Sequence, residues 1–286
     1  MNKIFLLTLF IGVAICSAAY GGEFYLLSHK CEPEVYEGTD STPQSPPLNV
    51  DDPGTPGCNA WEVNVLVDGD LTRSEKDWEL PLLDINYGIG DNIQLKYEVP
   101  YIVSQSGGVS ESAVGESRVG IKHMFFEDEE RKLEVAVYPQ LTFVSSKDDA
   151  VKKGLVTAGT ITTLPFLLAM KVGRVPQGDV RMTANLGYNI STKSDTADFV
   201  SAAVGVGVPL NRRLAIMGEL STEQAVATTV EKNREQLSKA VVGAILTISD
   251  RFLLFGSVGQ SLYSSDHKNH TYVLAGIRIM AGGPKK

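Results

Sequence analysis

Apolar and polar side chains alternate with a period of two from Trp61 almost to the end of the 286-residue chain. In the segment 93–101 every odd-numbered residue is aliphatic or aromatic, and residues 94, 96 and 98 are polar. The segments 133–143 and 180–190 repeat this alternation. Successive side chains of a β-strand point to opposite faces, so the pattern predicts strands with one apolar and one polar face. No convincing run with the helical period of about 3.6 residues interrupts the series.

The alternation predicts about twelve strands. Their approximate ranges are 60–68, 78–88, 93–103, 115–126, 133–144, 160–172, 180–191, 198–210, 214–223, 236–249, 252–263 and 271–281. Segments of about 9 to 13 residues are longer than the five or six residues typical of soluble sheets. Such lengths suit strands that cross a membrane at a tilt.

The connections between the predicted strands alternate in length. Those after even-numbered strands are mostly short, such as 89–92 and 250–251, and those after odd-numbered strands are on average longer and polar, such as 104–114 and 145–159. Outer-membrane barrels show the same asymmetry, with short periplasmic turns and long extracellular loops. Aromatic residues also gather near both ends of the predicted strands, where amphipathic rings suit the two lipid–water interfaces.

The mean hydropathy of −0.01 excludes a helical membrane protein with repeated apolar spans of about 20 residues. A β-barrel keeps such a value because half of its strand residues face a polar lumen. The net charge of −8 argues against a nucleic-acid-binding surface, which needs a basic patch. A soluble β-sandwich would not explain strand length, loop asymmetry and aromatic placement together. The sequence therefore predicts an all-β protein, a transmembrane antiparallel barrel over residues 60–286 in the bacterial outer membrane.

Residues 1–19 have the features of a cleaved signal peptide. Lys3 precedes an apolar run of about 12 residues, which is too short to span a membrane, and small residues follow up to Ala19. A lipoprotein site at Cys16 is less favoured, because the preceding Ile15 is bulky.

Residues 20–59 form an irregular arm rich in Pro, Gly, Ser and Thr. The arm contains Cys31 and Cys58, which are expected to form a disulfide in an exported protein, with two free thiols as the alternative. The arm could lie in the periplasm or plug the lumen. Because it directly precedes the first strand, our hypothesis is that it enters or caps the periplasmic mouth.

The polar faces of the predicted strands carry charged residues of both signs that are expected to face the lumen. They are Glu62, Asp84, Glu98, Glu134 and Glu219, and Lys96, Arg118, Lys122, Lys171, Arg181, Lys239 and Arg278. Opposite charges on neighbouring strands attract. One interpretation is a selectivity surface, and the other is a self-neutralising network that supports the barrel. Five acids against seven bases favours the network and is compatible with a weak preference for anions.

Several motifs resemble a known family. They are the segment 51–57 followed by Trp61, and the runs 79–88, 94–100, 114–122 and 138–140. Together they are similar to the bacterial outer-membrane barrel family named for the meta-pathway of phenol degradation, also labelled "transporter". The resemblance implies an outer-membrane β-barrel and the passage of aromatic or hydrophobic compounds. One departure is the end of the last strand, where no terminal aromatic residue is present for recognition during barrel assembly.

The sequence therefore predicts a passive channel for small solutes, with no cofactor. Its expected partners are outer-membrane lipid, the solute and the barrel-assembly machinery, and no nucleic acid. One alternative is a non-conducting structural or adhesion barrel.

A third possibility is a lipid-modifying enzyme. His123 is the single histidine within a predicted strand, and Ser117 on the same strand is about 20 Å away, so the pattern does not favour catalysis. His267 and His270 lie in a predicted outer loop with too few further ligands for a metal site.

Overall fold

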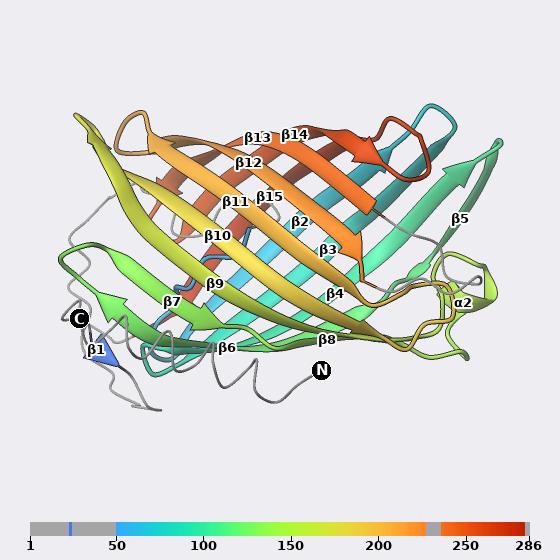
Figure 1. Cartoon of the computed structure of the whole chain (residues 1–286), viewed down its shortest axis with the longest axis horizontal. Helices are drawn as coiled ribbons and strands as arrows, with labels where there is room; N and C mark the ends of the chain where they lie inside the picture. Colours follow the sequence, from blue (N-terminus) through green and yellow to red (C-terminus); the bar gives the residue numbers. More distant parts are fainter. Residues whose placement is uncertain (1–22, 25–49, 227–235, 284–286) are drawn as a thin grey trace.

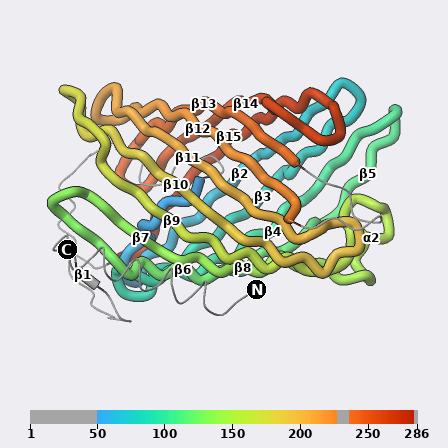
Figure 2. The backbone as a smooth tube through the Cα atoms, viewed as in Figure 1, coloured from blue at the N-terminus to red at the C-terminus, as the bar shows by residue number. Residues whose placement is uncertain are grey.

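The computed structural model describes residues 23–24, 50–226 and 236–283 (Figure 1). Their tilted strands form the wall of a single closed barrel, as the backbone trace shows (Figure 2). The predicted signal peptide and most of the predicted arm lie outside the described residues, so the cleavage after Ala19 stays a prediction. No helix in the described ranges is long and apolar enough to cross a membrane.

The barrel wall is built from antiparallel strands that follow one another in sequence order. They are β2 (Ala60–Leu71), β3 (Glu75–Ile89), β4 (Ile93–Ser106), β5 (Val109–Val114), β6 (Ser117–Asp128), β7 (Leu133–Val137), β8 (Gln140–Val144), β9 (Gly159–Val175), β10 (Gly178–Ser191), β11 (Phe199–Pro209), β12 (Leu214–Ala225), β13 (Gln236–Ser249), β14 (Phe252–Ser264) and β15 (Thr271–Gly282). The last strand pairs with the first from Thr271 opposite Leu71 to Gly282 opposite Ala60, which closes the barrel.

Two interruptions reduce these strands to the twelve that the sequence predicts. β5 and β6 form one wall strand that is interrupted at Gly115 and Glu116, and β7 and β8 form another that is interrupted at Tyr138 and Pro139. Pro139 has no N–H to donate, but its carbonyl oxygen accepts a hydrogen bond from the Ile121 N–H at 3.0 Å. The wall therefore continues across this interruption.

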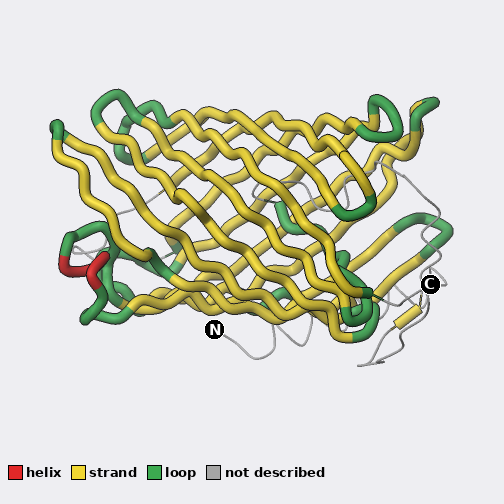
Figure 3. Tube along the Cα trace, turned by 180° about the vertical axis from the view of Figure 1, so that it is seen from behind, coloured by secondary structure: helices red, strands yellow, loops and turns green. Residues whose placement is uncertain are grey.

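The two ends of the barrel differ, as the alternation of connections predicts. One end, here the short-turn end, has tight connections such as 176–177 and 250–251. The other, the long-loop end, carries the helix α2 (Asp149–Lys152) within the connection 145–158 (Figure 3). The short strand β1 (Glu23–Phe24) pairs with β6 beyond the end of its ladder with β4, where Phe24 lies opposite Phe126.

The segment 104–114 differs from its prediction as a loop. β4 continues to Ser106, and β5 runs back from Val109, so that the two form a hairpin. Gly107 and Gly108 form its tip with φ angles of 59° and 83°, a region that glycine adopts without steric cost. The Gly-Gly pair was the signal for this hairpin.

The outer face of the wall is apolar, and the inner face is polar. Ile121, Leu186 and Val242 are more than half exposed on the outside, at 53%, 58% and 62%. By contrast, Lys122 and Glu219 point inward and are buried. A soluble protein has the opposite arrangement, so this distribution of side chains suits a wall surrounded by lipid.

Candidate functional site

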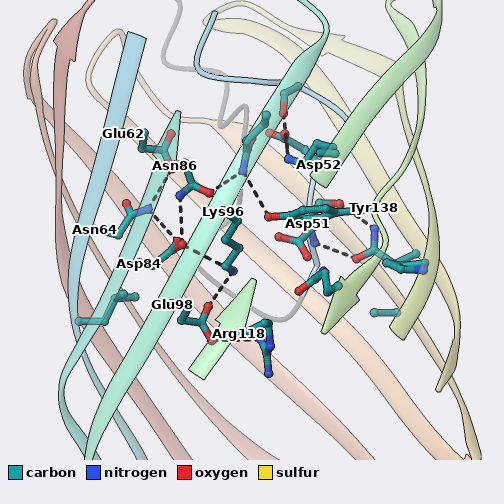
Figure 4. Close-up of a pocket in the computed structure, with 18 of the residues that line it drawn as sticks. Asp51, Asp52, Glu62, Asn64, Asp84, Asn86, Lys96, Glu98, Arg118 and Tyr138 are labelled. Atoms are coloured by element: carbon teal, nitrogen blue, oxygen red, sulfur yellow. Dashed lines mark hydrogen bonds and ion pairs between the residues drawn. The ribbon is translucent and has the colours of Figure 1, made fainter. Parts of the chain in front are cut away.

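A cavity of about 1270 Å³ lies inside the barrel. Its lining includes side chains from β2, β3 and β4 and from the adjoining strands β13, β14 and β15. Residues of the predicted arm, including Asp51 and Asp52, also line it. Figure 4 shows this wall from within, with Lys96 at the centre of a polar network.

The structure places nine of the twelve predicted lumen residues on the cavity lining. They are Glu62, Asp84, Lys96, Glu98, Arg118, Lys122, Glu134, Lys239 and Arg278. The other three have specific partners. Arg181 pairs with Glu134 at 2.9 Å, and Lys171 pairs with Asp179 at 2.6 Å. Glu219 accepts a hydrogen bond from the Val50 N–H at 3.2 Å.

Acidic and basic side chains alternate along the inner wall from β15 to β6. The Arg278 guanidinium lies 3.3 Å from Glu62 and donates a hydrogen bond to Asn64 at 2.9 Å. The Asn64 amide in turn donates to Asp84 at 3.0 Å, which links β15, β2 and β3. This half of the row uses an amide between the two carboxylates, so no two like charges are in direct contact.

The row continues across β4 to β6. The Lys96 ammonium lies 2.7 Å from Glu98 and 3.6 Å from Asp84, and Arg118 lies 3.1 Å from Glu98 (Figure 4). Lys96 therefore lies between two carboxylates. The arrangement is neutral over its six charged members, and this much agrees with a self-neutralising network.

Buried amides fix the positions of these charges. Gln94 donates hydrogen bonds to the Asn86 side chain at 2.5 Å and to the Tyr138 hydroxyl at 3.3 Å. Asn86 donates to Asp84 at 3.1 Å. Tyr138 is 1% exposed. Buried polar groups that are hydrogen-bonded to one another hold a single geometry, so this wall is a fixed surface.

Residues 50–56, here called the lumenal segment, cross the inside of the barrel. The Asp51 N–H donates to the Asn185 side-chain oxygen at 2.7 Å, and the Asn185 amide donates back to the Asp51 carbonyl at 2.7 Å. On the opposite side, the Lys122 ammonium donates to the Gly54 carbonyl at 2.9 Å, and the Thr55 hydroxyl donates to the Asp91 carbonyl at 2.8 Å. The segment thus connects β10 with β6 and with the turn between β3 and β4.

Two carboxylates of the lining, Asp68 and Glu79, are absent from the predicted set. They are direct register partners on β2 and β3. On β3, Leu80 and Pro81 lie opposite a single residue of β2 and a single residue of β4, so β3 contains a β-bulge. The bulge reverses the alternation of faces along β3, so a strict period of two assigns Glu79 to the wrong side. Asp68 keeps the regular alternation of β2 and lies at the end of the predicted strand 60–68. The Leu80-Pro81 pair in a strand was the available signal for the bulge.

The lining is more acidic than the predicted set. It contains fourteen carboxylates and six basic side chains. The acidic members are Asp51, Asp52, Glu62, Asp68, Glu79, Asp84, Asp91, Glu98, Glu116, Glu127, Glu129, Glu134, Glu223 and Asp250, and the basic members are Lys96, Arg118, Lys122, Lys132, Lys239 and Arg278. The near-balance expected from the sequence holds for the row of ion pairs but not for the cavity as a whole.

His123, the candidate base, is not among the residues that line the cavity. His123 lies on the same face of β6 as the exposed Ile121, with its ring centroid 6.4 Å from that of Phe125. No group of three potential metal ligands occurs within the described ranges. Cys58 is buried, and Cys31 lies outside the described residues, so the disulfide stays a prediction.

His270 lies between two carboxylates at the long-loop end. Its Nδ1 is 2.8 Å from Asp70 and its Nε2 is 3.1 Å from Asp266. Partial burial opposes the charged form of His270, but the hydrogen bonds to Asp70 and Asp266 raise its pKa above the usual 6.5. These contacts join the loop 265–270 to β2, so they serve to position the loop.

Solved structures resemble this barrel in fold. An outer-membrane channel from Pseudomonas putida F1 is similar, with a TM-score of 0.60 and 13% identity over 88% of this chain and 100% of that chain. The NanC porin is also similar, with a TM-score of 0.55 and 8% identity over 76% of this chain and 98% of that chain. No protein-family model matches the sequence, and no curated protein matches it.

These likenesses define the class of protein as a closed, twelve-stranded antiparallel barrel of the outer-membrane type. Within that class the chain resembles channels and porins, and the identities are low enough that the likeness shows the fold alone. The family resemblance of the sequence motifs is therefore supported at this coarser level, that of an outer-membrane barrel with the architecture of a channel.

Proposed function

We propose that the protein is a passive channel for small solutes in the bacterial outer membrane. The observation that carries this proposal is the continuity of the cavity. Its lining includes Asp91 and Asp250 at the short-turn end, and Ile161 and Glu223 near the long-loop end. Side chains along the whole height of the wall therefore surround one space, as a route through the barrel requires.

The size of the barrel agrees with small solutes. Eight-stranded barrels are filled by their own side chains, whereas barrels of 16 to 18 strands enclose wide aqueous channels. Twelve strands lie between these limits. We infer that the lumen passes small molecules and ions and excludes large ones.

One part of the lining suits aromatic or hydrophobic solutes, the class that the family resemblance suggests. Phe255, Leu253 and Leu274 lie on the lining and pack together with Ile245. This apolar surface lies on β13, β14 and β15, beside the β15 end of the charged row, where the Arg278 guanidinium lies 5.9 Å from the centroid of the Phe255 ring. A solute with an apolar part could contact it without displacing any ion pair.

We also propose that the lumenal segment narrows the route. It is held by main-chain hydrogen bonds to side chains of the wall at both of its ends. A variant that keeps the signal peptide for export and lacks residues 20–58 should have a higher single-channel conductance in planar bilayers. An unchanged conductance would show that the segment does not restrict the route.

The test of the proposed function is direct. Purified protein, with residues 1–19 removed on export as the sequence predicts, should insert into planar lipid bilayers and give step-like increases in current. Heat-modifiable gel migration of the outer-membrane fraction checks that the barrel is folded. A folded barrel that passes no current would refute the channel and would favour the structural or adhesion barrel.

A further inference from the structure

We propose that this channel admits small cations in preference to small anions, an inference that rests on the proposed channel function. The fourteen carboxylates of the lining exceed its six basic side chains. Arg181 and Lys193 lie outside the lining, and they pair with the lining residues Glu134 and Glu116. Adding these two cations leaves the carboxylates in clear excess.

Three of the six basic side chains of the lining are held by carboxylates at short range. Lys96, Arg118 and Arg278 lie 2.7, 3.1 and 3.3 Å from Glu98 or Glu62. A permeating anion would have to compete with these fixed carboxylates for each of the three cations. The neutral row therefore contributes little attraction for anions, and the charge preference depends on the carboxylates outside it.

The most distinctive of those carboxylates are Asp68 and Glu79. The bulge on β3 brings Glu79 into the lumen directly opposite Asp68, which the regular alternation of β2 places there. Neither forms an ion pair with a described residue, and like charges in this position destabilise a sheet. The basic side chain that acts on Asp68 is Lys239, whose ammonium lies 4.7 Å from the centroid of the Tyr272 ring. The one that acts on Glu79 is Arg118, which forms an ion pair with Glu98. A passing cation would relieve the repulsion between the two carboxylates.

A second carboxylate position lies on the lumenal segment. Asp52 lines the cavity and is 4% exposed. Its Oδ2 has no hydrogen-bond partner among the described residues, and its Oδ1 is 4.0 Å from the Lys122 ammonium, which also donates to the Gly54 carbonyl. Figure 4 shows Asp52 on the lumenal segment, inside the strands that carry the row of ion pairs. Carboxylates therefore occur both on the lumenal segment that crosses the lumen and on the wall strands β2 and β3.

Physical principles connect this arrangement with selectivity. Charged side chains that line a narrow pore select the ion of opposite sign, and conduction needs sites that attract an ion weakly enough to release it. The pair Asp68 and Glu79 on the wall and Asp52 on the lumenal segment are open groups that meet that requirement, whereas a closed cage of ligands would hold the ion. The inferred solute class is thus small cations. It includes organic cations with an aromatic part that can contact the apolar surface formed by Phe255, Leu253 and Leu274.

The test is the reversal potential under a KCl gradient across a bilayer that contains the full exported chain. The expected permeability ratio of K⁺ to Cl⁻ is several-fold above one. In D68N/E79Q it should fall by about twofold or more while the channel stays open. The matched control D77N/E111Q removes two exposed carboxylates outside the lining, and its ratio should stay close to that of the wild type.

Organic ions of similar size give an independent measurement. Benzylammonium should permeate several-fold better than benzoate through the wild-type channel. If D68N/E79Q fails to show heat-modifiable migration, the single variant E223Q serves in its place and should lower the ratio in the same direction. An open channel with a ratio at or below one would refute the charge preference alone. A folded barrel without any current would refute the channel, and this inference with it.

Discussion

The close approach of the lumenal side of β3 to the end of the arm, just before β2, offers the sharpest test of how the lumenal segment is held. A Cβ atom placed on Gly88 would lie 1.8 Å from the carbonyl oxygen of Gly57. Contacts of a real Cβ are essentially never below 3.0 Å. In Gly88→Ala, the Gly57 carbonyl must therefore move away by more than about 1 Å, a shift that a close-packed interior transmits to its neighbours.

Two main-chain hydrogen bonds are made at this contact, one to the Gly57 carbonyl and one to the Gly88 carbonyl. The Ala60 N–H donates to the Gly57 carbonyl at 3.3 Å, and the Asn59 N–H donates to the Gly88 carbonyl at 3.1 Å. If each contributes about 1 kcal/mol, the substitution weakens the attachment of the segment by about 2 kcal/mol. That energy corresponds to a roughly 30-fold increase in the population of the detached segment.

Two measurements on Gly88→Ala can detect the detachment. Proteinase K should cleave within residues 50–59 faster than in the wild type, as followed by mass spectrometry, and the single-channel conductance should be larger or more variable. Gly218→Ala is the matched control, because its Cβ would meet no atom within 4 Å. Equal cleavage rates and equal conductance in the two variants would refute the reasoning.

Three further predictions concern separate parts of the barrel. Asn185→Ala removes both hydrogen bonds to the Asp51 main chain, about 2 kcal/mol in all, and should increase current fluctuations in single-channel records while heat-modifiable migration is retained. Lys96→Met leaves Asp84 and Glu98 without their shared cation. Because the lumen is open to water, we expect the free energy of unfolding to fall by about 1–2 kcal/mol, less than the 3–5 kcal/mol lost when a fully buried pair is broken. The measurement is the urea midpoint of unfolding, which should be lower than in the wild type. The raised pKa of His270 means that its contacts with Asp70 and Asp266 stabilise the loop 265–270 fully below pH 6.5 and are lost as the pH rises through the folded pKa, so protease cleavage in this loop should increase at high pH, and His270→Gln should abolish that dependence.

The strands of the wall could be predicted from the sequence because each one carries its own signal. An alternating pattern is local, and it fixes both the strand and its lipid-facing side wherever the register is regular. A strict alternation misses Glu79, because one extra residue in the β3 ladder reverses the alternation without changing the composition of the strand. The charge of the lumen was therefore the least predictable property of the wall.

The path of the lumenal segment could not be predicted for a different reason. Its hydrogen bonds join residues that are far apart in the sequence, such as Asp51 and Asn185, which are separated by 134 positions. No periodicity records such a contact, because the partner is an ordinary amide on the polar face of a strand. Proximity to the first strand suggested that the arm enters the barrel, but only the assembled wall shows which side chains hold it.

The closure of β15 against β2 has a consequence for the order in which the molecule forms. Residues 50–56 contact β6, β10 and β12 from the inside, and β2 begins at Ala60, a few residues further along the chain. A sealed wall offers no sideways entry. The segment must therefore be enclosed while the seam is still open, or be threaded lengthwise through an end of the finished cylinder. In the first case residues 50–56 would serve as a template on which the later strands β6, β10 and β12 assemble.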